Sequence, residues 1–204
     1  MSMNPDAPTV VLASASAVRT RLLTSAGVPH IVDPAHIDEA SVRDKMLAAD
    51  AAHSAIAEAL AELKAQKMSQ NHADVIVLGA DQVLSCDGVL FEKPADIVGV
   101  RAHLNTLMGK DHTLFTSVCA VRDGEVIWHV NTAAVLHMRP LSDEFVDHYV
   151  DTVGEAACQS VGAYLLEGLG IQLFSRIEGD FFTILGLPMV PLLEFLRDNN
   201  VIER

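Results

Sequence analysis

Positive charge is scarce in this sequence. Fourteen Lys and Arg residues stand against 27 Asp and Glu residues, so the 204-residue chain has a formal net charge of −13. Affinity for nucleic acid or anionic lipid comes mainly from cationic side chains, so this composition argues against non-specific binding to either. A polyanionic ligand would instead need a small local cationic pocket, with a metal ion to offset its charge.

Cysteine and paired metal ligands are also scarce. Cys86, Cys119 and Cys158 are far apart with no CxxC spacing, so neither a disulfide framework nor a zinc site is indicated. The nine histidines include no HExxH pair, which argues against a transition-metal site. A hard cation such as Mg²⁺ needs only carboxylate and phosphate oxygens. A reducing, cytoplasmic location is the simplest prediction.

Long apolar runs are absent as well. No run approaches the roughly 18 residues of a membrane span. Residues 1–8 lack the basic and hydrophobic regions of a signal peptide, and we expect them to be a flexible N-terminus.

Apolar residues make up half of the chain, and the mean hydropathy is +0.28, so disorder is excluded for most of its length. Strand and helix patterns alternate, with a hairpin expected at Asp123-Gly124. This order predicts one α/β domain over residues 1–204, with a mixed twisted central sheet and helices on both faces. The expected strands are 9–13, 29–32, 74–79, 83–85, 113–121, 126–138 and 171–177. The expected helices are 17–26, 39–50, 51–66, 96–108, 143–153 and 188–197, with a loop at 67–73.

The junction after the first strand is the first candidate site. Ser14, Ser16 and Arg19 surround the start of a helix, where free backbone N–H groups and the helix dipole favour an anion. Arg19 could add a bidentate contact to a phosphate. The alternative is that Ser16 is an ordinary N-cap and Arg19 a solvated surface residue.

Asp81 is the second candidate, because it directly follows an apolar strand. Carboxylates at the C-terminal end of an interior strand lie where α/β sheets usually bind ligands. There Asp81 could activate a water molecule or help to hold Mg²⁺. The alternative is a turn residue at the strand end.

Two lysines and an acidic pair complete the candidates. Lys64 lies beside the apolar helix face formed by Ile56, Leu60 and Leu63, and Lys93 precedes Pro94. In a chain this acidic, a lysine at the edge of the core is a candidate phosphate ligand, although most lysines are solvated. Asp38-Glu39 precedes a helix, where acidic residues complement the dipole.

Taken in order, these motifs resemble those of the Maf family of nucleotide pyrophosphatases, within the inosine-triphosphate-pyrophosphatase-like fold. Leu12 to Arg19, followed by Leu22-Leu23, resembles the family's opening LASxSPRRxxLL, and Gly79-Ala80-Asp81-Gln82 resembles its GADT/GSDQ signature. Each match is weak alone, whereas six in order are strong. The other four matches are Asp38-Glu39 taken together with Leu60-Ala61 and Lys64-Ala65, Lys93-Pro94, Val161-Gly162-Ala163-Tyr164 with Glu167-Gly168, and Ile177-Glu178-Gly179 with Gly186-Leu187-Pro188.

The resemblance implies a cytoplasmic house-cleaning hydrolase that converts a nucleoside triphosphate to its monophosphate and pyrophosphate, in a cleft between two lobes. It implies that Asp81 is the general base and that Mg²⁺ or Mn²⁺ is held partly by Glu39 or Asp81. It also implies a homodimer. By the same resemblance, phosphate charge is offset by Arg19, Lys64 and Lys93, with hydrogen bonds from Ser14 and Ser16.

The nucleobase is the least determined feature. Gln82 and Glu167 resemble the subgroup that acts on 7-methyl-GTP, and Gln82 is expected beside the reacting phosphate. Ala17, Val18 and Gln159-Ser160 depart from the family pattern, and Val18 fits neither substrate subgroup. A carboxylate at Glu167 could accept hydrogen bonds from a guanine edge, which predicts a guanine-type substrate. The alternative for this residue is that Glu167 faces solvent and the pocket selects the base only loosely, by shape. The alternatives are a dTTP/UTP pyrophosphatase of the same family and a nucleotide-binding regulator with little turnover.

Overall fold

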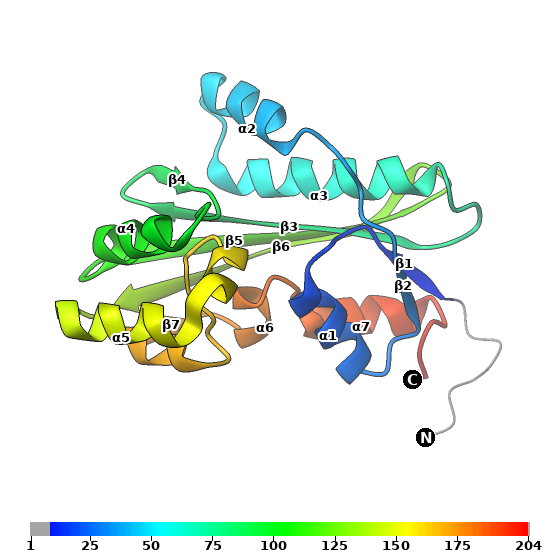
Figure 1. The fold of residues 1–204 in the computed structure, drawn as a ribbon. Helices are drawn as coiled ribbons and strands as arrows, with labels where there is room; N and C mark the ends of the chain where they lie inside the picture. The colour runs from blue at the N-terminus through cyan, green and yellow to red at the C-terminus, as the bar shows by residue number, and fades with distance from the viewer. Residues whose placement is uncertain (1–8, 204) are drawn as a thin grey trace. The chain divides into compact units, whose positions relative to one another are not determined.

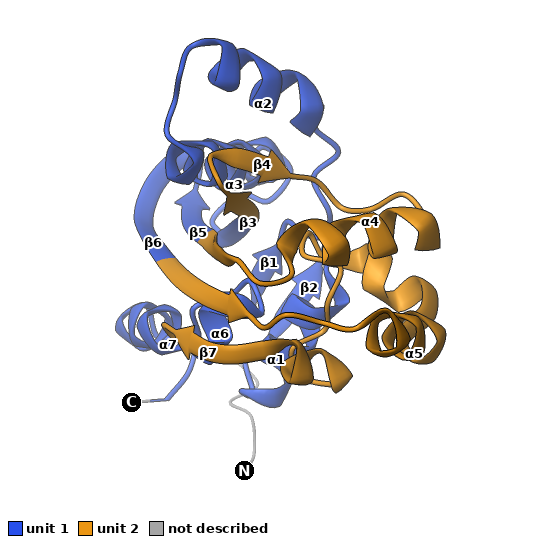
Figure 2. Ribbon diagram, turned by 90° about the vertical axis from the view of Figure 1, so that its left-hand side faces the viewer, with its two compact units in different colours: residues 1–81, 116–132, 181–204 blue, residues 82–115, 133–180 orange. Residues whose placement is uncertain are grey.

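The computed structural model describes residues 9–203, so the expected flexible N-terminus, residues 1–8, lies outside the described residues. The chain forms two compact units (Figure 2). In the described part, unit 1 comprises residues 9–81, 116–132 and 181–203, and unit 2 comprises residues 82–115 and 133–180. Among the described residues, no helix is long and apolar enough to span a bilayer.

The strands form one mixed seven-stranded sheet in the order β2-β1-β3-β5-β6-β7, with β4 paired to β3. β1 is parallel to β2 and β3, whereas β4 and β7 are antiparallel to their partners. The strands are β1 Val10–Leu12, β2 His30–Val32, β3 Val77–Cys86, β4 Val89–Phe91, β5 Asp111–Arg122, β6 Glu125–Met138 and β7 Phe174–Glu178. The α-helices are α1 Ala17–Ser25, α2 Glu39–Ala48, α3 His53–Ser69, α4 Ile97–Leu107, α5 Asp143–Val153, α6 Phe181–Ile184 and α7 Met189–Asp198. Two 3₁₀ helices are η1 Gly154–Gln159 and η2 Leu169–Leu173.

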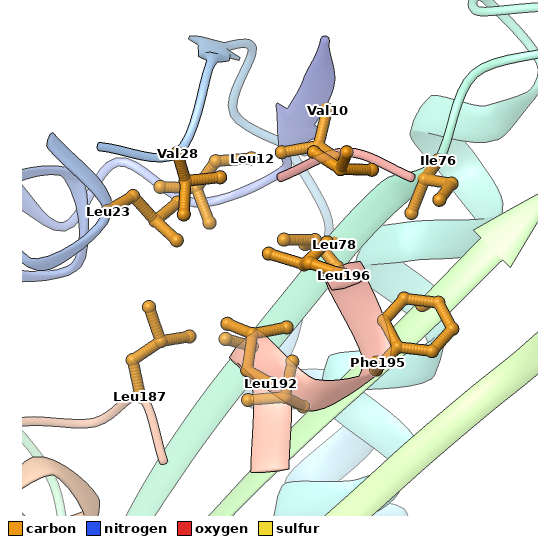
Figure 3. Close-up of a cluster of buried hydrophobic side chains, with 14 of the residues drawn as sticks. Val10, Leu12, Leu23, Val28, Ile76, Leu78, Leu187, Leu192, Phe195 and Leu196 are labelled. Atoms are coloured by element: carbon orange, nitrogen blue, oxygen red, sulfur yellow. The ribbon is translucent and has the colours of Figure 1, made fainter. Parts of the chain in front are cut away.

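Strand β1 is buried on both faces: all three of its residues are buried, and successive side chains point to opposite sides of a strand. On one face, Val10 and Leu12 of β1 pack in a cluster with helices α1 and α7 (Figures 1 and 3). On the other face, Val11 and Ala13 pack in a cluster with helix α3. The predicted α/β sheet with helices on both faces is therefore confirmed.

Helix α3 approaches strand β3 closely because Gly79 has no side chain. A Cβ atom on Gly79 would lie 2.0 Å from the Ala61 carbonyl oxygen and 2.9 Å from the Ala65 Cβ atom. The buried face of α3 is accordingly lined by small side chains next to the strand, and it includes Lys64. This close packing brings Lys64 onto β3, where it contacts Asp81.

Unit 2 contains its own buried polar and aromatic groups. The Tyr149 hydroxyl of α5 donates to the Ala163 carbonyl at 3.4 Å and accepts from the Leu165 N–H at 3.3 Å. His112 of β5 lies 2.8 Å, Nε2 to Oη, from Tyr164, whose ring packs edge-on against Phe174. These contacts hold the segment after α5 against β5.

Several predictions differ from the structure. β3 runs without interruption from Val77 to Cys86, so the expected break at residues 80–82 is wrong and Asp81 lies within a strand. Leu63 is 39% exposed, because the buried face of α3 is displaced toward its small residues. The expected loop at 67–73 begins later, since α3 continues to Ser69, and the last strand begins at Phe174 rather than 171. β4 and α6 were not predicted.

Candidate active site

A cluster of ionisable side chains lies where helix α3 packs on strand β3. The Lys64 ammonium is 2.6 Å from Asp81 Oδ1 and 2.8 Å from Glu39 Oε1. The Lys64 and Asp81 side chains are 8% and 9% exposed, whereas Glu39, at the start of α2, is 44% exposed. One cation therefore holds two carboxylates, one inside the protein and one at its surface.

Asp81 is an ionisable group in a poorly hydrated setting. Burial raises the pKa of its carboxyl above the ordinary value, while the Lys64 ammonium and, more weakly, the Arg19 guanidinium oppose the rise. A carboxylate with a raised pKa accepts a proton more readily than an exposed aspartate. Asp81 therefore has the properties of a general base.

Arg19 is buried beside this cluster and binds the protein itself. Its Nε donates to the Gly186 carbonyl at 2.7 Å, and its Nη1 donates to Ser14 Oγ and to the Ala80 carbonyl, both at 2.9 Å. Only 8% of Arg19 is exposed. The alternative of a solvated surface arginine is therefore wrong.

The start of α1 is organised as the sequence predicts. Ser16 is the N-cap, and its hydroxyl accepts from the Arg19 N–H at 3.4 Å. The Ser14 hydroxyl accepts from the Ser16 N–H at 3.3 Å. Helix α1 begins at Ala17 with no acidic residue in its first turn, which leaves its N-terminus favourable to an anion.

The structure brings together some of the predicted site residues. Arg19 binds Ser14 Oγ and the carbonyl of Ala80, the residue before Asp81. Lys64 contacts both Asp81 and Glu39. All of these residues belong to unit 1. Other members of unit 1 are Ser16 and the half-buried Val18. Unit 2 contains the half-buried Gln82 and the exposed Lys93 and Glu167.

Gln82 differs from its expected position. It follows Asp81 within the uninterrupted strand β3, and consecutive strand side chains leave opposite faces. Gln82 and Asp81 are therefore adjacent in sequence without being side by side.

Sequence reasoning missed the backbone groups of the site. The carbonyls of Ala80 and Gly186 are both held by Arg19, and Gly186 has a φ of +87°. A Cβ atom on Gly186 would lie 3.3 Å from the guanidinium nitrogens. The motif Gly186-Leu187-Pro188 is visible in the sequence, but nothing local indicates that its partner is Arg19.

Asp81 and Glu39 are the side chains that could hold a divalent cation. Mg²⁺ is commonly bound by one or two carboxylates together with phosphate oxygens of the substrate and water. The two carboxylates fit this pattern, since both contact the same ammonium group and so lie near each other. Within residues 9–203, no group of three or more His, Cys, Asp or Glu side chains is placed to hold a metal ion. A cation here would therefore need oxygens from a bound ligand.

Comparison with known proteins gives a consistent result. A family model described as "Maf-like protein" matches residues 9–199. A "Nucleoside triphosphate pyrophosphatase" from Paramagnetospirillum magneticum is 52% identical over 189 residues, which cover 93% of this chain and 97% of that protein. A "7-methyl-GTP pyrophosphatase" from Rhizobium meliloti is 46% identical over 197 residues, which cover 96% and 98% respectively.

Likeness to a solved structure is weaker. The crystal structure of a nucleoside-triphosphatase / dITP/XTP pyrophosphatase from Mycobacterium abscessus has a TM-score of 0.41 and 15% identity. It covers 65% of this chain and 75% of that chain. Similarity at this level bears on neither fold nor function.

Proposed function

The chain belongs to the Maf-like family, and we propose that it is a nucleoside triphosphate pyrophosphatase, which hydrolyses its substrate to the monophosphate and pyrophosphate. The observation that carries the proposal is the buried Asp81 carboxylate, held by Lys64 beside the N-terminus of α1. In this acidic chain, Lys64 and Arg19 place two positive charges beside the two carboxylates of the cluster, and a metal ion would offset the further charge of a triphosphate. The names of the relatives from Paramagnetospirillum magneticum and Rhizobium meliloti support the same activity.

Asp81 acts as the general base in this proposal. A water oxygen attacks the α-phosphorus and gives its proton to Asp81. The bond from that phosphorus to the oxygen leading to the β-phosphorus breaks, and pyrophosphate leaves. Lys64 contacts Asp81 Oδ1, so Oδ2 is the oxygen that accepts the proton.

Positioning and charge stabilisation provide most of the catalysis of phosphoryl transfer. Lys64 and the N-terminus of α1 offset phosphate charge, and Ser14 and Ser16 contribute hydroxyl groups. Asp81 and Glu39 would hold Mg²⁺ or Mn²⁺, which when bound supplies further positive charge at the phosphate oxygens.

Pyrophosphate release from a panel of triphosphates, with Mg²⁺ or Mn²⁺, tests the proposal. Asp81→Asn keeps the side-chain shape and removes the base, so kcat should fall by about 10²–10⁴-fold. A melting temperature and circular dichroism spectrum like those of the wild type would show that the fold is kept. Unchanged turnover in Asp81→Asn would remove Asp81 from this role. Tight nucleotide binding without pyrophosphate release by the wild type would instead favour a nucleotide-binding regulator.

We propose a guanine-type base, including 7-methylguanine, as the preferred substrate. A carboxylate such as Glu167 can accept hydrogen bonds from the ring N–H and the amino group of a guanine edge, whereas thymine and uracil offer only one ring N–H. It would also offset the positive charge of a 7-methylated base. Val18 provides neither the stacking surface of a tryptophan nor the donors of an arginine, so Glu167 is the candidate selector.

Values of kcat/KM for 7-methyl-GTP, GTP, dTTP and UTP test this preference. We expect the guanine nucleotides to be favoured by about 5- to 150-fold, since a bound base would cover the exposed Glu167 and a mismatched base would leave that carboxylate covered and unpaired. Glu167→Gln should lower the ratio of kcat/KM for guanine nucleotides to kcat/KM for pyrimidine nucleotides. Glu155→Gln, at another exposed carboxylate of unit 2, serves as the control. A wild-type preference for pyrimidines, or an unchanged ranking in Glu167→Gln, would contradict the proposal.

A further inference from the structure

Arg19 uses most of its hydrogen-bonding capacity on the protein. A guanidinium group has one N–H on Nε and two on each terminal nitrogen. The N–H on Nε donates to the Gly186 carbonyl. The two N–H groups on Nη1 are matched by two acceptors at 2.9 Å, Ser14 Oγ and the Ala80 carbonyl. All three acceptors are neutral, so Arg19 does not bind them in order to neutralise charge.

This arrangement leaves no complete bidentate fork for a phosphate. A bidentate contact from arginine to a phosphate or carboxylate uses two nitrogens, either Nε with Nη2 or Nη1 with Nη2. In each pair one nitrogen already binds the protein. A bidentate contact from Arg19 would therefore require breaking a buried hydrogen bond, which contradicts the geometry that the sequence suggests.

The three acceptors lie on separate segments around Asp81. Ala80 immediately precedes Asp81, so its carbonyl belongs to the peptide unit that carries the Asp81 N–H. Ser14 follows β1, and Gly186 lies in the turn that leads to α7, 167 residues from Arg19. A planar guanidinium fixes the directions of its donors, which a flexible ammonium group cannot do.

We propose that Arg19 is a positioning residue for the proposed pyrophosphatase reaction: it fixes the peptide that carries Asp81 against Ser14 and Gly186. Its effect on the reaction passes through the direction of the Asp81 carboxylate, and its contact with phosphate is limited to Nη2. This inference rests on the proposed function.

Two substitutions separate this role from phosphate binding. Arg19→Lys keeps the charge and loses the planar fork, and Arg19→Gln loses both. For a positioning residue, both variants should lower kcat by similar factors of about 10–100, with the Kd for inorganic pyrophosphate within about threefold of the wild type. Arg21→Lys and Arg21→Gln, at an exposed arginine of the same helix, are the matched controls and should remain near wild type. Each variant is assayed well below its own melting temperature, so that loss of fold is not read as loss of kcat.

The opposite pattern would overturn the inference. If Arg19 mainly binds phosphate, Arg19→Lys will keep most of kcat, and Arg19→Gln will weaken pyrophosphate binding by about tenfold or more. A wild type that is inactive on every triphosphate contradicts the proposed function instead, which distinguishes the two failures.

A second measurement does not depend on turnover or on a folded variant. In ¹⁵N-labelled wild-type protein, the Arg19 Nε–H resonance should be protected from exchange and should stay in place when pyrophosphate and Mg²⁺ are added, because its acceptor is the Gly186 carbonyl. The signal is assigned as the protected Nε–H resonance that Arg19→Lys removes or, if that variant does not fold, from through-bond correlations to the Arg19 backbone. A large shift or loss of protection on adding pyrophosphate would show that Arg19 releases Gly186 to bind phosphate.

Discussion

The two units each bury an ionisable side chain, and they do so in opposite ways. In unit 1, Asp81 is surrounded by the cations Lys64 and Arg19, and it lies 2.6 Å from the Lys64 ammonium. In unit 2, His112 is 2% exposed and contacts the neutral Tyr164 hydroxyl, while its Nδ1 has no hydrogen-bond partner among the described residues. In unit 1 two cations compensate the buried acid, whereas in unit 2 the buried base has no oppositely charged hydrogen-bond partner and is neutral at pH 7.

The pKa values of the two groups follow from this difference. Burial lowers the pKa of His112 to about 4, with His137 acting in the same direction and Asp111 opposing it. His112 is therefore neutral at pH 7 and serves the packing of unit 2. Burial raises the pKa of Asp81 while two cations oppose the rise, and in the proposed reaction Asp81 is the group of the two that accepts a proton.

Removing the Lys64 ammonium, the cation that compensates Asp81, should have a larger effect on stability than the changes at His112 and Glu39. Lys64→Met leaves Asp81 buried without its partner, which should lower the free energy of unfolding by about 3–5 kcal/mol. Urea unfolding at pH 7 measures the loss. The double variant Lys64→Met/Asp81→Asn removes the uncompensated charge and should recover a large part of it. A double variant as unstable as the single one would show that Lys64 stabilises the fold by packing rather than by charge.

His112 predicts a pH effect in unit 2. Its folded pKa lies below the unfolded value of about 6.5, so the unfolded chain binds more protons between pH 6.5 and about 4. The stabilisation is complete above pH 6.5 and is lost as the pH falls through this window, by about 3 kcal/mol in total. His112→Gln does not titrate, so its unfolding free energy should fall less over the same range. Parallel curves for the two proteins would contradict the prediction.

Glu39 should give the smallest effect on stability, because it is the exposed member of the ion cluster. Its side chain is 44% exposed, and exposed ion pairs contribute about 1 kcal/mol or less. Glu39→Gln should therefore leave the melting temperature nearly unchanged while raising the Mg²⁺ concentration needed for half-maximal pyrophosphate release. Asp38→Asn, one residue earlier, is a poor control since Asp38 caps α2. Asp44→Asn, further along the same helix, is a better one. Equal Mg²⁺ dependence in Glu39→Gln and wild type would exclude Glu39 as a metal ligand.

Local sequence signals were sufficient for much of the fold. Ser16 is the N-cap of α1, as one of its two interpretations expected, and the predicted Asp123-Gly124 turn joins β5 to β6 with φ values of +52° and +83°. These features depend on residues close in sequence. The presence of Ser14, Arg19, Lys64 and Asp81 in one site was also anticipated, although through the order of motifs rather than through any local rule.

The remaining features depend on distant partners. Asp81 continues strand β3 where turn chemistry suggested a break, because Lys64, 17 residues earlier, compensates its burial. Ile56 and Leu60 mark the buried face of α3 as predicted, whereas Leu63 does not lie on it, since the absence of a side chain at Gly79 brings the small residues of α3 against the strand. Arg19 contacts carbonyls 61 and 167 residues away, and a backbone acceptor has no signature in the sequence.

The division of unit 1 into three stretches has a consequence for synthesis. Leu192 and Leu196 of the last helix complete the same apolar cluster as Val10 and Leu12 of the first strand (Figure 3). On the ribosome, strand β1 must therefore wait for helix α7, which is made much later. Until α7 emerges, the nascent chain keeps this apolar face uncovered, which makes it a substrate for chaperones and a target for aggregation.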